Sequence, residues 1–204
     1  MISTPTVYVV DDDPGALRSL CWLIRQAELP VRAFHSGREF LESYRCQDPG
    51  CLVLDVRMPE MGGLDVQEHL KESGAELPII FITAHGDVPT CAQALKAGAI
   101  DYLEKPLNGK AFLDRVREAL TRATELKKQG SASEFAARIA RLTPREKDVL
   151  DMLVSGKSLK EIATASNVTV QTIWKQRLAI HKKMGVENDV ELVRLATDPA
   201  NERS

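Results

Sequence analysis

The chain has 204 residues and a formal net charge of −2, and 44% of its residues are hydrophobic. That length is enough for one domain of ordinary size and a smaller second one. Every apolar run is shorter than the ~18–20 residues that a membrane span needs. The first ten residues hold no Lys or Arg, so we expect neither a membrane protein nor a secreted one.

The cysteines are typical of a reducing compartment. The chain has four, Cys21, Cys46, Cys51 and Cys91, and none belongs to a CxxC pair. A disulfide between Cys46 and Cys51 would bridge a loop, but reduced thiols are the better interpretation. We therefore expect a soluble protein of the cytoplasm.

Charge is divided unevenly along the chain. Residues 1–122 hold 13 Lys and Arg against 18 Asp and Glu, whereas residues 123–204 hold 14 against 11. Within Lys157–Met184, six basic residues face only Glu161. This division indicates two domains, the second with a polyanionic partner, although a solvated lysine-rich surface would give the same counts.

The first part of the chain alternates between two patterns. Short apolar or β-branched runs predict strands at Val7–Val10, Val31–Phe34, Leu52–Leu54, Ile79–Thr83 and Tyr102–Leu103. After each run, apolar residues recur at helical spacing: Leu17, Leu20, Cys21 and Ile24; Phe40, Leu41 and Tyr44; Leu64, Val66 and Leu70; Cys91 and Leu95; Phe112, Leu113, Val116 and Leu120. Such βα units favour an open parallel sheet with helices on both faces.

Charged or hydroxyl side chains stand at the carboxyl ends of four of these strands. They are Asp11–Asp13, Asp55, Thr83 and Lys105. In open α/β sheets, sites form outside the carboxyl ends of the strands where the strand order reverses, so we expect these groups to converge. Carboxylates within ~4–6 Å of one another repel strongly, and a hard divalent cation such as Mg²⁺ relieves that repulsion.

This combination of groups suits phosphoryl transfer. Asp55 is a candidate nucleophile toward a phosphoryl group, and the product would be an acyl phosphate. Lys105 and the hydroxyl of Thr83 would hold the new phosphoryl oxygens while the cation offsets their charge. Each residue alone has an ordinary explanation, such as a helix cap or a surface turn, but four strand ends together favour a site.

The motifs VYVVDDD, LVLDVRMPEMGG, PIIFITAHGD and ALKAGAIDYLEKP, in this order, resemble those of a two-component receiver domain over about residues 5–122. The resemblance implies a flavodoxin-like, five-stranded parallel (βα)5 fold with Asp55 as the phosphoacceptor. It also implies that Asp12, Asp55 and the backbone carbonyl of Arg57 bind Mg²⁺. Asp11 would contribute mainly through a water of the metal.

The same resemblance assigns the remaining receiver residues. Thr83 would be the switch hydroxyl, Lys105 the phosphate-binding lysine and Tyr102 the switch aromatic on the last strand. The bond between Lys105 and Pro106 would be cis. The segments GDVP and KAGAIDYLEKP are most similar to the FixJ group, in which the helix after the fourth strand belongs to the dimer surface.

The rest of the chain has the start signals of helices. An N-cap acceptor is followed three residues later by Glu at Thr143–Glu146, Ser158–Glu161 and Asn188–Glu191, as in capping boxes. Thr169 is the candidate cap of a further helix. We expect helices near 143–155, 158–166, 169–184 and 188–197. The tight turn ASNVT between the second and third predicts a helix-turn-helix, with a four-helix docking module as the alternative.

The third of these helices has two distinct faces. The residues expected to pack inward are Ile173, Gln176, Ile180 and Met184. The opposite face suits the base edges and phosphates of DNA, and carries Gln171, Lys175, Leu178 and Lys182. Lys160 and Thr169 are candidate phosphate contacts at helix starts.

The segment from LTPREKDVL to ELVRLA resembles the LuxR-type DNA-binding domain of NarL/FixJ regulators over its whole length. Family members commonly have Lys and His where this chain has Trp174 and Gln176. Trp174 lies on the flank between the buried and exposed faces. Packing, contact with sugar or methyl groups, and contact with a partner are the alternatives for it, and Lys175 is a candidate to compensate for the missing Lys.

The sequence therefore predicts three parts: a receiver domain at 1–124, a helix extension and linker at 125–139, and a helix-turn-helix domain at 140–204. A flexible hinge is expected in the polar run Lys127–Ser133. The whole resembles a response regulator of the NarL/FixJ type. A histidine kinase would phosphorylate Asp55, the receiver would form homodimers, and the second domain would bind double-stranded DNA, with RNA polymerase as a further partner.

Two other functions fit parts of the sequence. In the first, the second domain binds protein instead of DNA. In the second, the chain is a phosphohydrolase with an aspartyl-phosphate intermediate, which uses the same Asp, Lys, Thr and magnesium. Such enzymes normally show DxD around the nucleophile and a cap over the substrate. Here Val56 and Arg57 follow Asp55 and no insertion can form a lid, so we expect a regulator and not an enzyme.

Overall fold

The structure is a computed structural model that describes residues 5–45, 49–84 and 86–201. The chain forms two compact units, Met1–Lys127 and Lys128–Ser204. Cys21, Cys51 and Cys91 are free thiols, while Cys46 lies outside the described residues. In the described part of the chain, no helix is both long enough and apolar enough to span a membrane.

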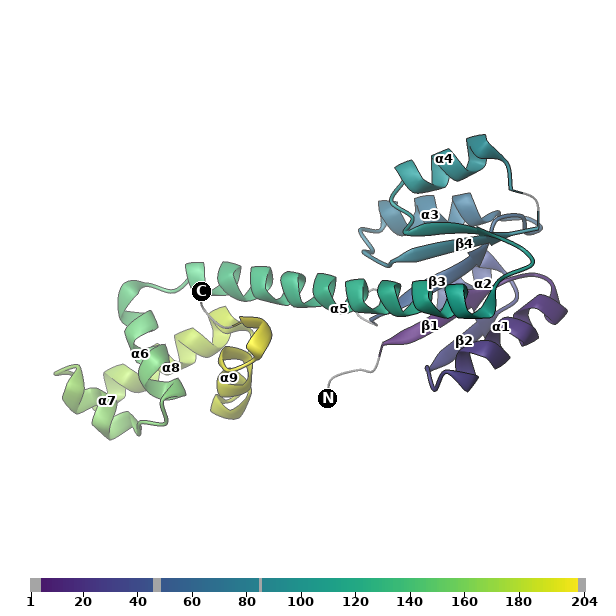
Figure 1. Ribbon diagram of the computed structural model, residues 1–204. Coiled ribbons are helices and arrows are strands. Elements are labelled where there is room, and N and C mark those ends of the chain that lie inside the picture. The colour runs from purple at the N-terminus through teal and green to yellow at the C-terminus, as the bar shows by residue number, and fades with distance from the viewer. Residues whose placement is uncertain (1–4, 46–48, 85, 202–204) are drawn as a thin grey trace. The chain divides into compact units, whose positions relative to one another are not determined.

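The first unit is built on a five-stranded parallel sheet (Figure 1). Its strands are β1 (Thr6–Val10), β2 (Val31–Phe34), β3 (Gly50–Asp55), β4 (Ile79–Thr83) and β5 (Asp101–Glu104). They lie in the order β2-β1-β3-β4-β5, which is the flavodoxin-like order. The predicted α/β fold is confirmed, and every predicted strand is present.

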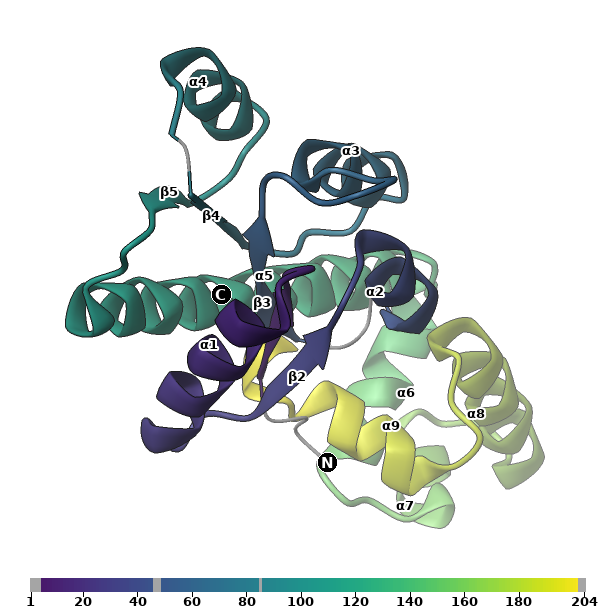
Figure 2. The ribbon, with the colours of Figure 1, turned by 90° about the vertical axis from the view of Figure 1, so that its right-hand side faces the viewer.

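Helices cover both faces of this sheet (Figure 2). Helices α1 (Pro14–Gln26) and α5 (Gly109–Ala140) pack on one face, whereas α2 (Gly37–Ser43), α3 (Gly63–Glu72) and α4 (Val88–Lys96) pack on the other. Alternate residues of a strand point to opposite faces of the sheet, and helices cover both faces here. Every residue of β3 and β4 is therefore buried. This explains why their sequences are nearly continuous apolar runs.

Helix α4 forms where it was predicted but turns a different face to the sheet. Its one buried residue is Ala94, and Leu95 is 43% exposed. The spacing of Cys91 and Leu95 therefore predicted the helix correctly, but not the side that packs.

The second unit is helical, as predicted. Its elements are the part of α5 from Lys128 onward, α6 (Pro144–Val154), α7 (Leu159–Ala165), α8 (Val170–Met184), α9 (Asp189–Ala196) and a 3₁₀ turn at Pro199–Asn201. They enclose a core that includes Leu150, Ile162, Ile173, Ile180 and Leu192. The capping boxes at Thr143–Glu146 and Ser158–Glu161 have both of their reciprocal hydrogen bonds.

The third predicted capping box is only half formed. The side chain of Asn188 accepts a hydrogen bond from the N–H of Glu191 at 2.9 Å. The Glu191 carboxylate instead accepts from the N–H of Glu187 at 2.9 Å and from the Asn188 side-chain amide at 3.2 Å. Asn, unlike Ser or Thr, carries amide donors of its own, and these compete for the Glu carboxylate.

The run Lys127–Ser133, where a flexible hinge is predicted, is helical, because helix α5 is continuous from Gly109 to Ala140. The run contains Lys127, Lys128 and Gln129, which favour helices, and its one glycine costs only about 1 kcal/mol in a helix. No atom lies within 4 Å of the position that a Cβ on Gly130 would take. A single glycine in such a run does not end a helix.

Glu146 is a buried acidic residue of the second unit whose carboxylate accepts several hydrogen bonds. It is 7% exposed, and its carboxylate accepts hydrogen bonds from Lys183 Nζ at 2.7 and 2.8 Å and from the N–H of Thr143 at 2.7 Å. Burial acts to raise the pKa of Glu146, but these bonds outweigh burial and hold its pKa below the usual value.

We predict that Lys183→Met lowers the free energy of unfolding of the second unit by about 1–3 kcal/mol at pH 7, because a buried carboxylate loses its charged donor. A depressed carboxyl pKa stabilises the fold above the unfolded-state pKa of about 4.3, and this contribution is lost as the pH falls through the folded-state pKa. The difference from the parent should therefore close below about pH 4.

Urea unfolding at several pH values, followed by circular dichroism, measures this difference. Lys182→Met is the matched control, because Lys182 is exposed and makes no ion pair within the described residues. Its free energy of unfolding should change by less than about 0.5 kcal/mol. Equal losses in the two variants would contradict the assigned role of Lys183.

Candidate functional site

Four residues singled out in the sequence lie at the carboxyl edge of the sheet. Asp55 and Thr83 end β3 and β4, and Asp11 and Lys105 directly follow β1 and β5. Strands β1 and β3 pair in parallel up to the residues that precede the two aspartates. The strand order reverses between β1 and β3, which is where ligand sites form in open α/β sheets.

Lys105 joins the two aspartates. Its Nζ lies 2.8 Å from Oδ2 of Asp11 and 2.9 Å from Oδ1 of Asp55, and these aspartates are only 1% and 6% exposed. Burial acts to lower the pKa of Lys105, but hydrogen bonds and attraction from both carboxylates outweigh it and raise the pKa. Lys105 is therefore protonated at neutral pH and offsets the repulsion between the carboxylates.

The remaining carboxylate oxygens are also held. Oδ1 of Asp11 accepts the N–H of Asp13 at 2.9 Å, and Oδ2 of Asp55 accepts the N–H of Arg57 at 2.8 Å. The expected cis bond between Lys105 and Pro106 is present. Asp11, Asp55 and Lys105 thus form one ordered cluster, which we call the acceptor cluster.

The expected magnesium ligands are gathered only in part. Asp12 is exposed, and the Arg57 side chain forms an exposed ion pair with Asp87 at 3.6 Å. Within the described ranges, no three or more His, Cys, Asp or Glu side chains are arranged to hold a metal. Mg²⁺ commonly takes one or two carboxylates and fills its other positions with water and phosphate oxygens, so the carboxylates of Asp11 and Asp55 are a fitting donor pair.

The two expected switch residues are neighbours on β4 and β5. Thr83 is 1% exposed, and Tyr102 lies against Phe81 with ring centroids 6.3 Å apart. The buried Tyr102 hydroxyl has no well-aligned hydrogen-bond partner among the residues described. Burial raises the pKa of Tyr102, and the nearby Thr83 side chain opposes that rise.

Sequence reasoning missed the part that Gly63 plays in this site. A Cβ at Gly63 would lie 2.4 Å from the backbone oxygen of Asp55 and 2.9 Å from the Phe81 ring. Only glycine lets the start of α3 approach the end of β3 so closely. In the sequence, Gly63 stands beside a second glycine just before α3, and nothing in that pattern signals this contact.

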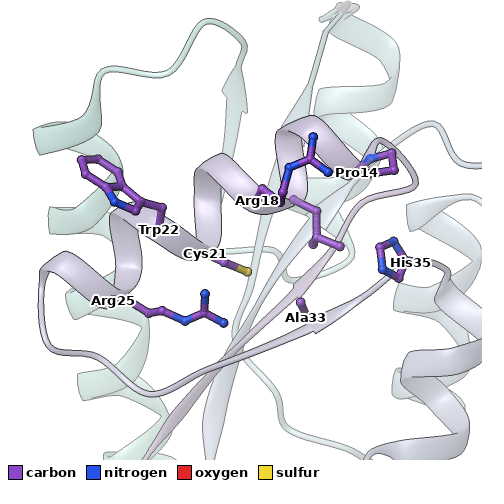
Figure 3. Close-up of a pocket in the computed structure, with 8 residues that line it drawn as sticks. Pro14, Arg18, Cys21, Trp22, Arg25, Ala33 and His35 are labelled. Atoms are coloured by element: carbon purple, nitrogen blue, oxygen red, sulfur yellow. The ribbon is translucent and has the colours of Figure 1, made fainter.

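A cavity of about 570 Å³ lies beside α1 (Figure 3). Its lining includes Arg18, Cys21, Trp22, Arg25 and His35, and no residue of the acceptor cluster. Figure 3 shows Arg18, Trp22 and Arg25 projecting from the helix on different sides. The acceptor cluster is therefore not part of this cavity.

In the second unit, helix α8 has the two predicted faces. Ile173, Ile180 and Met184 are fully buried, and Gln176 is half-buried. The residues predicted for the DNA face, namely Gln171, Lys175, Leu178 and Lys182, are exposed, and so is Trp174, which was expected on the flank of that face. At the start of α8, the Thr169 hydroxyl accepts the N–H of Thr172 at 3.2 Å and also bonds its hydroxyl at 2.9 Å. Lys160 is exposed on α7.

Two basic residues of α8 form ion pairs with acidic residues of the same unit. Arg177 Nε lies 2.7 Å from Oδ1 of Asp189, which is also 2.8 Å from His181 Nε2. Lys183 is held by Glu146. Both acidic partners lie outside the basic segment of the sequence, so its charge count overstates the cations that are free. Lys175 and Lys182 remain, with no ion pair to any described residue.

Comparison with known proteins identifies the two units. The response regulator receiver domain matches residues 7–117, and the luxR family of bacterial regulatory proteins matches residues 140–196. Response regulator protein TmoT of Ectopseudomonas mendocina is 42% identical over 190 residues, which cover 93% of this chain and 86% of TmoT. Transcriptional regulatory protein FixJ of Azorhizobium caulinodans is 40% identical over 191 residues, covering 93% of this chain and 90% of FixJ.

The chain belongs to the NarL/FixJ family of two-component response regulators. A solved structure of the response regulator StyR agrees, with a TM-score of 0.66 at 38% identity over 95% of this chain and 98% of StyR. A receiver followed by a LuxR-type DNA-binding domain makes this regulator a phosphorylation-dependent regulator of transcription.

The close approach of Gly63 to the backbone of Asp55 leaves no room for a larger residue. Gly63→Ala should lower the free energy of unfolding of the receiver by about 1–3 kcal/mol, because its Cβ meets backbone that cannot move freely. Gly130→Ala is the control, since its helical position is open and the change should stabilise by up to about 1 kcal/mol. Thermal unfolding measures both. A Gly63→Ala receiver as stable as the parent would refute the steric argument.

Proposed function

We propose that Asp55 accepts a phosphoryl group from a histidine kinase, and that the resulting acyl phosphate controls DNA binding by the second unit. The observation that carries this proposal is the acceptor cluster: two carboxylates at neighbouring strand ends, both held by one lysine. Asp55 is the better candidate nucleophile of the two because its side chain is the less buried one, at 6% exposure against 1% for Asp11.

The transfer needs only one bond to form and one to break. A carboxylate oxygen of Asp55 attacks phosphorus, while the bond from phosphorus to the kinase imidazole nitrogen breaks and that nitrogen keeps the electron pair and then takes up a proton. Lys105, already 2.9 Å from Asp55, moves its hydrogen bonds to the new phosphoryl oxygens. The hydroxyl of Thr83 supplies a further donor from the neighbouring strand.

The proposed Mg²⁺ ligands are Asp11, Asp12, Asp55 and the Arg57 carbonyl. When bound, the ion offsets the charge of the carboxylates and of the phosphoryl oxygens. The oxygen-only donor set and the two buried carboxylates support this assignment. The exposed side chain of Asp12 would turn toward the ion, while the N–H of Arg57 keeps Asp55 oriented.

Phosphorylation would act through the switch residues next to the cluster. Thr83 would move toward the phosphoryl group and leave space that Tyr102 fills, which changes the surface formed by α4, β5 and the start of α5. We propose that this surface then favours homodimers, so that two α8 helices meet half-sites related by two-fold symmetry. RNA polymerase is a further proposed partner, and the cytoplasm, where the DNA lies, is the proposed location.

Asp55→Asn should abolish labelling by a small phosphodonor, such as acetyl phosphate with Mg²⁺, because the amide is not a nucleophile of this kind. Mass spectrometry of the intact chain measures the labelling. Asp13→Asn is the matched control and should be labelled normally, since Asp13 is exposed and Asn caps helix α1 equally well. Undiminished labelling of Asp55→Asn would move the acceptor to another residue.

We propose that the exposed face of α8 and the neighbouring helix starts contact DNA. The residues are Lys160, Thr169, Gln171, Trp174, Lys175, Leu178 and Lys182. Their exposure supports this assignment, as do the absence of an ion pair at Lys175 and Lys182 within the described residues and the capping of α8 by Thr169. In a helix-turn-helix, the second helix enters the major groove.

Lys175→Ala should weaken DNA binding and reduce the slope of log affinity against log salt concentration by about 1, because one phosphate contact is lost. Fluorescence anisotropy at several salt concentrations measures both quantities. Lys147→Ala on α6 removes the same charge from another helix and should change neither. If Lys175→Ala leaves affinity and slope unchanged, another face of the unit meets DNA.

A further inference from the structure

Helix α8 exposes three large apolar side chains in one stripe. Val170 is 42% exposed, Trp174 50% and Leu178 45%. They follow one another at steps of four residues, and side chains four apart are neighbours on a helix surface. The stripe is not part of the core of the second unit, which takes Ile173, Ile180 and Met184 from the other side of the helix. An exposed stripe of this kind marks a contact with a partner.

The charges beside the stripe indicate what that partner is. Lys175 and Lys182 stand next to it and make no ion pair inside the described part of the unit. The only arginine of α8, Arg177, is held by Asp189. The surface is therefore apolar in its middle and cationic at its side, and helix α8 itself offers no free guanidinium for a bidentate contact with guanine.

A duplex offers a matching surface. The wall of the major groove is anionic, and the 5-methyl groups of thymine are the apolar groups on its floor. From Val170 to Leu178 the stripe rises about 12 Å along the helix, which is about the length of three to four base pairs. Trp174, the largest of the three side chains, covers the most apolar surface and lies at the middle of the stripe.

We propose that Trp174 and Leu178 read thymine methyl groups in each half-site, while Lys175 and Lys182 bind phosphates. Sequence preference then comes from apolar contacts, and affinity comes mainly from charge. This inference rests on the proposed DNA-binding face of α8 and deepens it, because it names the group that the face recognises. Trp174, which departs from the family pattern, would then contribute to sequence specificity.

The experiment uses the full chain activated with beryllofluoride and Mg²⁺. Duplexes selected by it from random DNA are resynthesised with each thymine of a half-site replaced in turn by deoxyuridine, which lacks only the methyl group. Fluorescence anisotropy then compares the affinities. Loss of one contacted methyl should weaken binding about fourfold, which corresponds to about 0.8 kcal/mol for one buried carbon.

Variants assign each methyl group to a side chain. Trp174→Ala should make binding insensitive to deoxyuridine at one position, and Leu178→Ala should do so at a neighbouring position. Both side chains are half-exposed, so both variants should keep the circular dichroism of the parent. Lys175→Ala is the matched control: it weakens binding to thymine and deoxyuridine duplexes alike and keeps their fourfold ratio.

The outcomes separate this inference from the proposed function. Specific binding that no deoxyuridine substitution weakens would overturn the reading of methyl groups and leave the DNA-binding face intact. The reading of methyl groups would also be overturned if Trp174→Ala and Leu178→Ala both keep the parent's sensitivity to deoxyuridine, or if the selected half-sites contain no thymine. Failure to select any duplex would overturn both, and would point to a protein partner for the stripe.

Discussion

The acceptor cluster depends on one interaction, the ammonium of Lys105 held between the carboxylates of Asp11 and Asp55. Two like charges buried side by side are costly unless a cation accompanies them. That cation comes from 94 residues away from Asp11 and 50 residues away from Asp55. The cluster therefore exists only when β1, β3 and β5 all hold their places, and any phosphoryl group added at Asp55 acts on the contact that joins them.

Much of this site could be predicted because its parts are local signals at strand ends. The strands are buried on both faces, so their sequences are apolar runs, and the charged residues that end them stand out. The role of Gly63 could not be predicted, because the approach of α3 to the Asp55 carbonyl is a tertiary contact. The side of α4 that packs on the sheet could not be predicted either. Ala94 and Leu95 are both apolar, and only tertiary packing decides which of them is buried.

In the second unit too, features set by local sequence could be predicted, whereas features set by long-range contacts could not. Caps are local, and the four predicted helices agree with the observed ones to within one residue at each end. Composition was less reliable: the polar run Lys127–Ser133 resembled a linker, but its helix-forming residues outweigh its one glycine. Charge counting over a segment overstates the free cations, because Asp189 and Glu146 neutralise Arg177 and Lys183 from outside that segment.

These internal ion pairs bear directly on how the regulator recognises DNA. With Arg177 and Lys183 held, α8 keeps two free lysines within the described structure, and lysine contacts with phosphate carry no sequence information. If the two free lysines bind phosphates as proposed, discrimination between base sequences would fall to Gln171 and the apolar stripe. The second unit also has a core of its own, so phosphorylation has no need to refold it. If the proposed dimers form, phosphorylation would control their population, and the proposed DNA-binding surface would stay unchanged.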